Sequence, residues 1–328
     1  MDKLSRLFTW RKRQPCVLSS ESAPVMHVMA IQDSKGLDAT RIAQTLLPRG
    51  RFELVPSSDL LPDTLAQPTL SAEQPSPVQA GTIAALLDLF AEGKTFGSLV
   101  TVPDEIADAL PALKAHIQPD ERDDIFQREA KQALAPLVDQ AELLGRQYDA
   151  VVANPPYMGG KGMNALLKSY VGKSYKDGKS DLFSAFIERG FTLISQSGYH
   201  SMVTMENWMF LNSFQNIREK ILNSYYIISM AHMPYLGKGG TSMGISFGTA
   251  ATVIRKARIA GTKGNYCCIR YFETDENFVP IEFPPRNERL ARTSCDDFKK
   301  IPGSPVAYWL SPNAYDVFEK SQKFEDVA

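Results

Sequence analysis

The stretch Tyr148-Asp-Ala-Val-Val-Ala-Asn-Pro-Pro-Tyr157 decides how this sequence folds and where its chemistry lies. Residues 148–153 form a short β-prone run, and Asn154-Pro-Pro-Tyr157 follows directly at its carboxyl end. Open α/β sheets bind their ligands at that end of a strand. Two consecutive prolines hold φ near about −65° and remove two backbone N–H donors. The sequence therefore predicts a stiff turn that presents carbonyl oxygens, one amide and one aromatic ring.

Strands and helices alternate downstream of this turn. Asp181 is expected to start a helix through 193, and a second helix is expected over 213–222. The strands are expected over 199–205, 225–230 and 249–255. Because no helix separates the last two, the strand at 249–255 is expected at an antiparallel edge. The fold class is therefore α/β, with part of a Rossmann-like, mainly parallel sheet and helices on both faces.

Upstream of the turn, the sequence predicts a mostly helical insertion. Residues 25–31 form an apolar run typical of a buried strand, and residues 48–77 have the composition of a loop. The segments expected as helices are 38–47, 82–91, 107–113 and 123–147. Residues 1–145 are thus expected to hold a cofactor-side strand plus the insertion, 146–262 the catalytic part, and 263–328 a connector.

Composition restricts the class of protein. The chain has 328 residues, of which 44% are hydrophobic and 22% charged, and this excludes collagen-like, coiled-coil and wholly disordered chains. No apolar stretch reaches about 18 residues, so no membrane partner is expected. The spacing of the four cysteines fits neither a disulfide scaffold nor a metal site. The basic start at residues 1–13 has no apolar signal core, which favours a reducing, cytoplasmic location.

The net charge of −1 conceals an uneven distribution. Residues 1–150 carry 15 basic and 21 acidic side chains. Residues 271–328 carry 7 basic and 11 acidic side chains. Residues 151–270 carry 14 basic and only 5 acidic side chains. A positive segment that begins at the turn indicates a polyanionic partner, although solvated surface lysines would give the same count. The candidate phosphate-binding side chains are Lys161, Lys168, Lys173, Lys176 and Lys179.

The Asn154–Tyr157 turn suits an amino-group substrate. The Asn154 side-chain oxygen and the Pro155 carbonyl can each accept a hydrogen bond from an NH₂ group, which directs the nitrogen lone pair toward an electrophile. Tyr157 can stack on a base, an interaction worth roughly 1–3 kcal/mol. The plainer alternative is a structural turn with a buried tyrosine.

The sequence here resembles the PglX family, the adenine-specific DNA methyltransferases of BREX phage-defence systems. Residues 28–31, 36–38 and 94–99 fit the same family. The main segments that carry the resemblance are 147–164 around the turn, Lys179-Ser-Asp-Leu-Phe183, Met202-Val-Thr-Met205, Asn207-Trp-Met-Phe-Leu211 and Ile301-Pro-Gly-Ser-Pro-Val-Ala-Tyr-Trp309.

The resemblance implies methyl transfer from S-adenosylmethionine to an adenine flipped out of double-stranded DNA. Asn154 and Pro155 would hold the amino group, Pro156 would set the turn, and Tyr157 would stack on the base. Other BREX components would be partners. Two alternatives stay open: a protein or RNA methyltransferase that holds an amide or amino group in the same way, and a non-enzymatic DNA-binding remnant.

The sequence departs from the family pattern in its cofactor motifs. No Gly-x-Gly follows a strand before Asn154, so the glycine-rich cofactor turn is expected upstream of Met1, and this chain is expected to be an internal slice that binds S-adenosylmethionine weakly by itself. Asp33 either contacts the cofactor or forms a turn. His200 and His232 are expected as core or boundary residues, and Trp208, Met209 and Phe210 either line a base pocket or pack in the core.

Overall fold

The computed structural model describes residues 29–47, 78–235 and 246–320. Residues 31–328 form one compact unit, separate from residues 1–30. The strand expected at 25–31 falls mostly outside the described residues, and its described end, 29–31, is not part of a strand. The loop expected at 48–77 also lies outside them. Among the described helices, none has the length and apolar character needed to cross a membrane.

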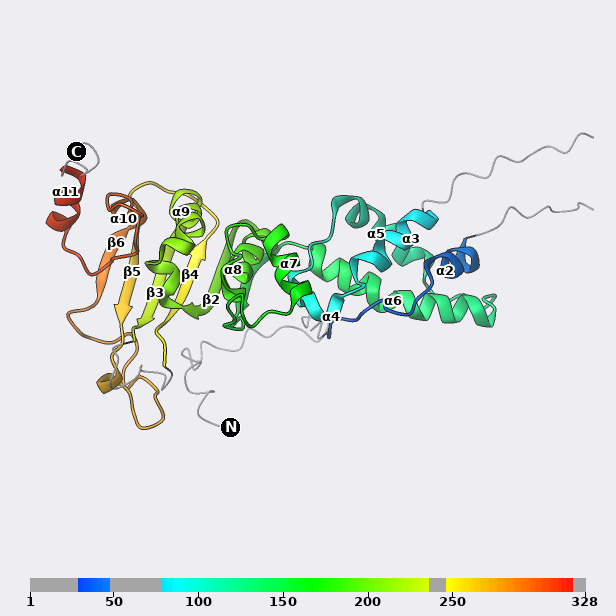
Figure 1. The fold of residues 1–328 in the computed structure, drawn as a ribbon, viewed down its shortest axis with the longest axis horizontal. Helices are drawn as coiled ribbons and strands as arrows, with labels where there is room; N and C mark the ends of the chain where they lie inside the picture. Colours follow the sequence, from blue (N-terminus) through cyan, green and yellow to red (C-terminus); the bar gives the residue numbers. More distant parts are fainter. Residues whose placement is uncertain (1–28, 48–77, 236–245, 321–328) are drawn as a thin grey trace, which may run out of the picture. The chain divides into compact units, whose positions relative to one another are not determined.

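The described residues before the turn are mostly helical, as expected, and we call residues 39–47 and 78–145 the helical part (Figure 1). Its elements are α2 (Ala39–Leu46), α3 (Ala80–Leu89), α4 (Gly93–Phe96), the short η2 (Gly97–Leu99), α5 (Asp104–His116) and α6 (Ile125–Gly145). Asp38 caps α2 by accepting from the amides of Thr40 and Arg41. Asp124 and Gln127 form a reciprocal capping box at the start of α6. The four helices expected here are confirmed.

The remaining described residues, 148–320, form the sheet part. Its six strands are β1 (Tyr148–Ala153), β2 (Ile194–Met205), β3 (Tyr226–Met233), β4 (Thr249–Arg255), β5 (Lys263–Cys268) and β6 (Ala291–Ser294). They lie in the order β1-β2-β4-β3-β5-β6. β1 pairs with β2, and β3 with β5, in parallel, whereas β4 is antiparallel to both β2 and β3. β1, β2, β3 and β5 therefore run in one direction and end at one edge of the sheet, the carboxyl edge.

Two features of the expected sheet are wrong. The sheet is mixed rather than mainly parallel, because β6 is also antiparallel to its neighbour β5. The strand at 249–255 is antiparallel as expected, but it lies inside the sheet between β2 and β3 rather than at its edge. An interior place completes the hydrogen bonding on both sides of β4, whose residues Ala250 and Ile254 are fully buried. Residues 263–268 and 291–294, expected in a connector, extend the sheet.

The sheet part has its own hydrophobic core. Helices α8 (Leu182–Leu193) and α9 (Gln215–Ser224) pack Phe183, Phe191 and Ile221 against alternate residues of the strands, such as Met202. Helices were also expected on the second face, yet some side chains that point there, such as Val152 and Tyr199, are exposed. The other helical elements are α7 (Ala165–Ser174), α10 (Cys295–Phe298), α11 (Pro312–Lys320) and the short η3 (Glu206–Met209), η4 (Asn212–Phe214) and η5 (Tyr271–Glu273).

A buried arginine joins the two parts. Arg189 on α8 is 3% exposed, and its guanidinium donates to the carbonyls of Ser98, Val100 and Leu144. It also donates to the hydroxyl of Thr192. Burial lowers the pKa of Arg189 from its ordinary value. These bonds satisfy carbonyls of the helical part from within the sheet part.

Candidate active site at the carboxyl edge of the sheet

The turn Asn154-Pro-Pro-Tyr157 lies where the sequence predicted it, directly after β1. Val152 and Ala153 of β1 pair with Ser201 and Met202 of the parallel strand β2, so the turn is beside the end of β2. Pro155 is buried, whereas Asn154 and Pro156 are exposed. The buried proline anchors the turn and leaves the Asn154 amide open to a ligand.

Two acceptors orient the Tyr157 hydroxyl. It lies 3.2 Å from both the Asn154 Oδ1 and the Val203 carbonyl of β2, which share its single donor proton. An amide oxygen has two lone pairs, so Asn154 can still accept from a substrate NH₂ group. Burial raises the pKa of Tyr157, and the phenol therefore stays a neutral donor near neutral pH.

A second aromatic residue, which the sequence analysis did not predict, faces Tyr157. The Phe247 ring lies 5.3 Å from the Tyr157 ring, measured between centroids, with the planes at 90°. Phe183 lies behind Tyr157 at 6.3 Å and 84°. Phe247 precedes β4, and the interior place of β4 brings it to the carboxyl edge. Two rings in edge-to-face contact therefore lie beside the Asn154 amide oxygen.

Asp181 fixes the chain that leaves the turn. Its carboxylate accepts from the amide of Met158 at 3.0 Å and also from that of Phe183, at the N-terminus of α8. The Met158 carbonyl in turn accepts from the Leu182 amide at 2.9 Å. Burial raises the pKa of Asp181. The sequence predicted Asp181 as a helix start, and the structure shows that it also clamps the catalytic turn to that helix.

A buried polar network lies at the same edge, after β2 and at the end of β3. His232 Nε2 is 2.6 Å from a Glu206 carboxylate oxygen, and His232 Nδ1 is 2.9 Å from the Tyr308 hydroxyl. Gly248 is next to Glu206, where a side-chain Cβ would come within 2.1 Å of the carboxylate. His232 is 4% and His200 0% exposed. Both are core residues, as predicted.

The three candidate residues after β2, Trp208, Met209 and Phe210, differ in burial. Trp208 is 1% exposed, and its indole N–H donates to the Thr204 hydroxyl at 3.1 Å. Met209 is fully buried. These two side chains are core residues and not pocket wall. Phe210 is half-buried and contacts His232 and Trp309 instead.

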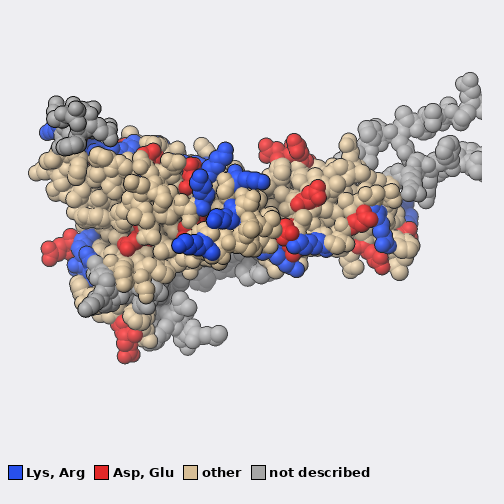
Figure 2. All heavy atoms as spheres, viewed as in Figure 1, with Lys and Arg blue, Asp and Glu red and all other residues tan. Residues whose placement is uncertain are grey.

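The five candidate lysines are all exposed, and none forms an ion pair with the described residues. These lysines were expected on a loop. That prediction is partly wrong, because Lys168 and Lys173 are on the helix α7. Asn164 caps this helix, and Leu167 and Val171 bury its inner face. Lysine and arginine side chains gather over α7 and α8 on the face shown in Figure 2.

Asp33 lies at the turn before α2. Its contacts among the described residues are with the helical part and not with the Asn154–Tyr157 turn. Its carboxylate accepts from the Lys94 amide of α4 at 2.6 Å, and the Leu37 amide donates to the Ser34 carbonyl. Within the described residues, no hydrogen bond of Asp33 reaches the Asn154–Tyr157 turn. The turn-forming alternative therefore accounts for its contacts.

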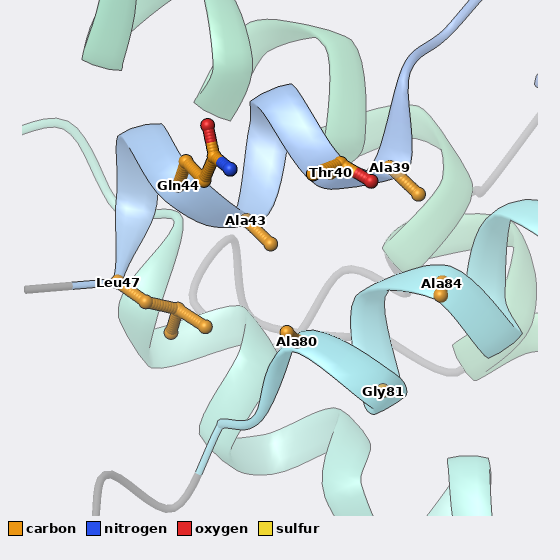
Figure 3. A pocket seen from close by; sticks show the side chains of 8 residues that line it. All are labelled: Ala39, Thr40, Ala43, Gln44, Leu47, Ala80, Gly81 and Ala84. Atoms are coloured by element: carbon orange, nitrogen blue, oxygen red, sulfur yellow. The ribbon is translucent and has the colours of Figure 1, made fainter.

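The helical part contains a hollow of about 550 Å³ between α2 and α3 (Figure 3). It has no charged side chain in its lining, and its polar side chains are those of Thr40 and Gln44. The lining residues are Ala39, Thr40, Ala43, Gln44, Leu47, Ala80, Gly81 and Ala84.

Comparison with known proteins identifies relatives of this chain. The Eco57I restriction-modification methylase family matches residues 88–236, which include the turn and its clamp. An adenine-specific methyltransferase BrxX from Escherichia coli (strain HS) is 37% identical over 293 residues, or 87% of this chain and 23% of that protein. The expected resemblance is confirmed. This chain is a relative of the BrxX and PglX methyltransferases over one segment of their length.

An adenine-specific methyltransferase PglX from Lacticaseibacillus casei (strain Zhang) is 33% identical over 272 residues, or 76% of this chain and 21% of that protein. The chain thus spans less than a quarter of the length of the curated relatives that it matches. Among solved structures, the DrdV–DNA complex aligns over 60% of this chain and 20% of that chain, with 16% identity and a TM-score of 0.38.

Proposed function

We propose that this chain carries the base-receiving part of a DNA adenine methyltransferase. The single observation that supports this most is the Asn154–Tyr157 turn at the end of β1, with Phe247 placed against Tyr157. The relatives BrxX and PglX are adenine-specific methyltransferases by name. The substrate is an adenine flipped out of double-stranded DNA, because its amino group is inaccessible to such a pocket inside the stacked duplex.

In this proposal, the turn orients the exocyclic amino group. Asn154 Oδ1 and the Pro155 carbonyl accept its two hydrogens, and the nitrogen lone pair then points away from the protein toward the methyl donor. Tyr157 and Phe247 hold the ring of the base. Catalysis arises from positioning and preorganised dipoles, so no covalent protein intermediate is needed. S-adenosylmethionine supplies a sulfonium-bound methyl group.

The chemistry of the Asn154–Tyr157 turn can be compared with what S-adenosylmethionine requires as the methyl donor. An acceptor pair that leaves the nitrogen lone pair free suits direct displacement at a methyl sulfonium, and Asn154 is exposed enough to receive both partners. The described residues of the turn therefore fit the amino-group side of the reaction. Glu206, the nearest carboxylate after β2, is engaged by His232 and by the Tyr235 amide.

The exposed lysines on and around α7 are proposed to contact DNA phosphates. Lys161, Lys168, Lys173, Lys176 and Lys179 follow the catalytic turn in the chain, and carboxylates of the described residues do not neutralise them. Phosphate contacts of this kind position the duplex without reading its sequence. These five lysines are among the 14 basic side chains of residues 151–270.

Substitution of Asn154 tests the proposed function. In the full-length protein, Asn154→Ala should abolish methyl transfer from labelled S-adenosylmethionine to plasmid DNA while leaving the Tm and DNA binding unchanged. Asn313→Ala on α11, also an exposed asparagine, is the matched control and should keep full activity. Methylation retained by Asn154→Ala would refute the role assigned to the turn.

A further inference from the structure

Trp309 is an exposed aromatic side chain that is nevertheless fixed in place. It is 55% exposed, yet its ring contacts three others: Tyr308 at 5.1 Å, Phe210 at 5.8 Å and His232 at 6.5 Å between centroids. The His232 and Trp309 planes are 24° apart, so the indole stacks on the imidazole. A large ring that is open to solvent but already ordered loses little side-chain entropy when a ligand covers it.

The support beneath Trp309 is the polar network at the carboxyl edge. His232 cannot turn without losing its bonds to Glu206 or to Tyr308, and Tyr308 stacks on Tyr266 of β5 at 5.2 Å and 11°. Glu206 is itself fixed next to Gly248 by the bond from its amide to the Gly248 carbonyl. The network thus connects Trp309 to the loop that presents Phe247 to Tyr157. In the proposed reaction, the residues of this network do not themselves contact the substrate.

The hollow beside Trp309 has two exposed cations without an ion pair among the described residues, Lys263 and Arg292, against one such carboxylate, Glu288, and this balance favours an anionic ligand. Trp309 and Arg292 of β6 line one hollow of about 650 Å³, and Arg292 is exposed and forms no ion pair with the described residues. Two acidic side chains of the hollow are already compensated, Asp296 by Arg258 and Lys299, and Asp297 by Lys300. Glu288, a third, is exposed.

We infer that Trp309 is a stacking platform for an unpaired nucleobase of the bound DNA, distinct from the target adenine held by Tyr157 and Phe247. Arg292 would contact the phosphate of the same nucleotide. An indole can stack on any base, so the platform adds affinity without reading the sequence. This inference rests on the proposed DNA methyltransferase function and adds a second nucleotide site to it.

Single-strand binding by the full-length protein tests the platform. The probe is fluorescein-labelled oligothymidylate, followed by fluorescence anisotropy over a range of salt concentrations. Trp309→Ala should weaken binding about tenfold, whereas Trp309→Phe should stay within about threefold of wild type, because a phenyl ring still stacks. The slope of log Kd against log salt should not change in Trp309→Ala. Arg292→Gln should lower that slope by about 0.7.

Phe318→Ala is the matched control, since Phe318 is an exposed ring on α11 with 44% exposure. It should bind the probe like wild type. Should Trp309→Ala lose its fold, Trp309→Leu replaces it, because leucine packs on His232 but cannot stack on a base. Binding by Trp309→Ala or Trp309→Leu equal to wild type, or equal losses in these variants and Phe318→Ala, would overturn the inference.

The outcome also separates this inference from the proposed function. If wild-type protein methylates DNA and Trp309→Ala binds the probe normally, the platform is wrong and the methyltransferase proposal stands. If wild-type protein neither binds DNA nor methylates it, the proposed function fails, and the platform fails with it.

Discussion

In the helical part, the buried core consists of leucine, isoleucine, valine and alanine, with Phe90 as its aromatic member among the described residues. The core of the sheet part contains many rings beside its aliphatic residues, among them Phe183, Phe191, Trp208 and Tyr266. The sheet part also buries Arg218, His200 and His232, whereas the described helical part buries one polar residue, Gln140, and Ser34 is buried just before it.

This difference in core composition indicates that the helical part is a support and that the sheet part carries the proposed chemistry. Aliphatic packing tolerates substitution as long as volume and pattern are kept, so the helical part can vary without loss of its shape. Buried rings and polar groups have directional contacts, and such contacts fix Tyr157, Asp181 and His232 at the carboxyl edge. The sheet part therefore holds the proposed site in a defined geometry, and the helical part is joined to it through Arg189.

Removal of Arg189 should have the largest effect, because it breaks the connection between the two parts. Arg189→Ala leaves three buried carbonyls without their donor, and the free energy of unfolding should fall by about 3–5 kcal/mol. Urea denaturation measures this. Arg128→Ala on the exposed face of α6 is the control and should stay within about 0.5 kcal/mol of wild type. Equal losses in the two variants would show that the connection is unimportant.

Core truncations should separate stability from activity. Leu134→Ala in the helical part and Phe183→Ala beneath Tyr157 both remove fully buried side chains and should each cost about 3 kcal/mol. Only Phe183→Ala should also reduce the methylation rate of folded protein, by tenfold or more in order of magnitude, because Tyr157 loses the ring behind it. A comparable rate loss in Leu134→Ala would contradict the division between support and chemistry.

The sheet part should also respond to pH through His200. Burial lowers the pKa of His200 to about 4, below the ordinary value of 6.5. The unfolded chain therefore binds the proton more tightly, so stability is complete above pH 6.5 and declines as the pH falls from there toward 4. Between pH 7 and 5, the loss should be about 2 kcal/mol in urea denaturation. His200→Leu should remove most of this pH dependence; an unchanged dependence would assign it to other groups.

The smallest expected effect compares single lysines on the two parts. Lys168→Gln on α7 should weaken binding of duplex DNA about two- to threefold and lower the salt slope by about 0.9. Lys114→Gln on α5 should have no effect, because Lys114 already pairs with Glu142 in the helical part. Anisotropy titrations at several salt concentrations measure both variants. Identical salt slopes for Lys168→Gln and wild type would argue against a phosphate contact.

Local patterns made several elements predictable from the sequence. The β-prone run before Asn154 and the capping residues Asp38 and Asp181 act within a few residues, so their sequence signals are complete. The helix α7 was missed because Gly160, Gly162 and Gly172 obscure it, although Asn164 with Leu167 and Val171 carries the signal of a capped helix.

Contacts between distant segments could not be predicted in the same way. The place of β4 between β2 and β3 depends on pairing with both strands, which no local pattern encodes. Phe247 meets Tyr157 only through that placement, and Trp309 reaches His232 across 77 positions of the chain. The sequence therefore predicted the strand β1 that leads into the Asn154–Tyr157 turn, whereas the placement of Phe247 and Trp309 required the fold.

Identification of the methylated product tests the central claim most directly. DNA incubated with the full-length protein and S-adenosylmethionine is digested to nucleosides and analysed by mass spectrometry, beside RNA and protein fractions of the same reaction. We expect N6-methyladenine in the DNA with wild-type protein and none with Asn154→Ala. Methyl groups found only in RNA or in protein amides, or N6-methyladenine formed equally by Asn154→Ala, would contradict it.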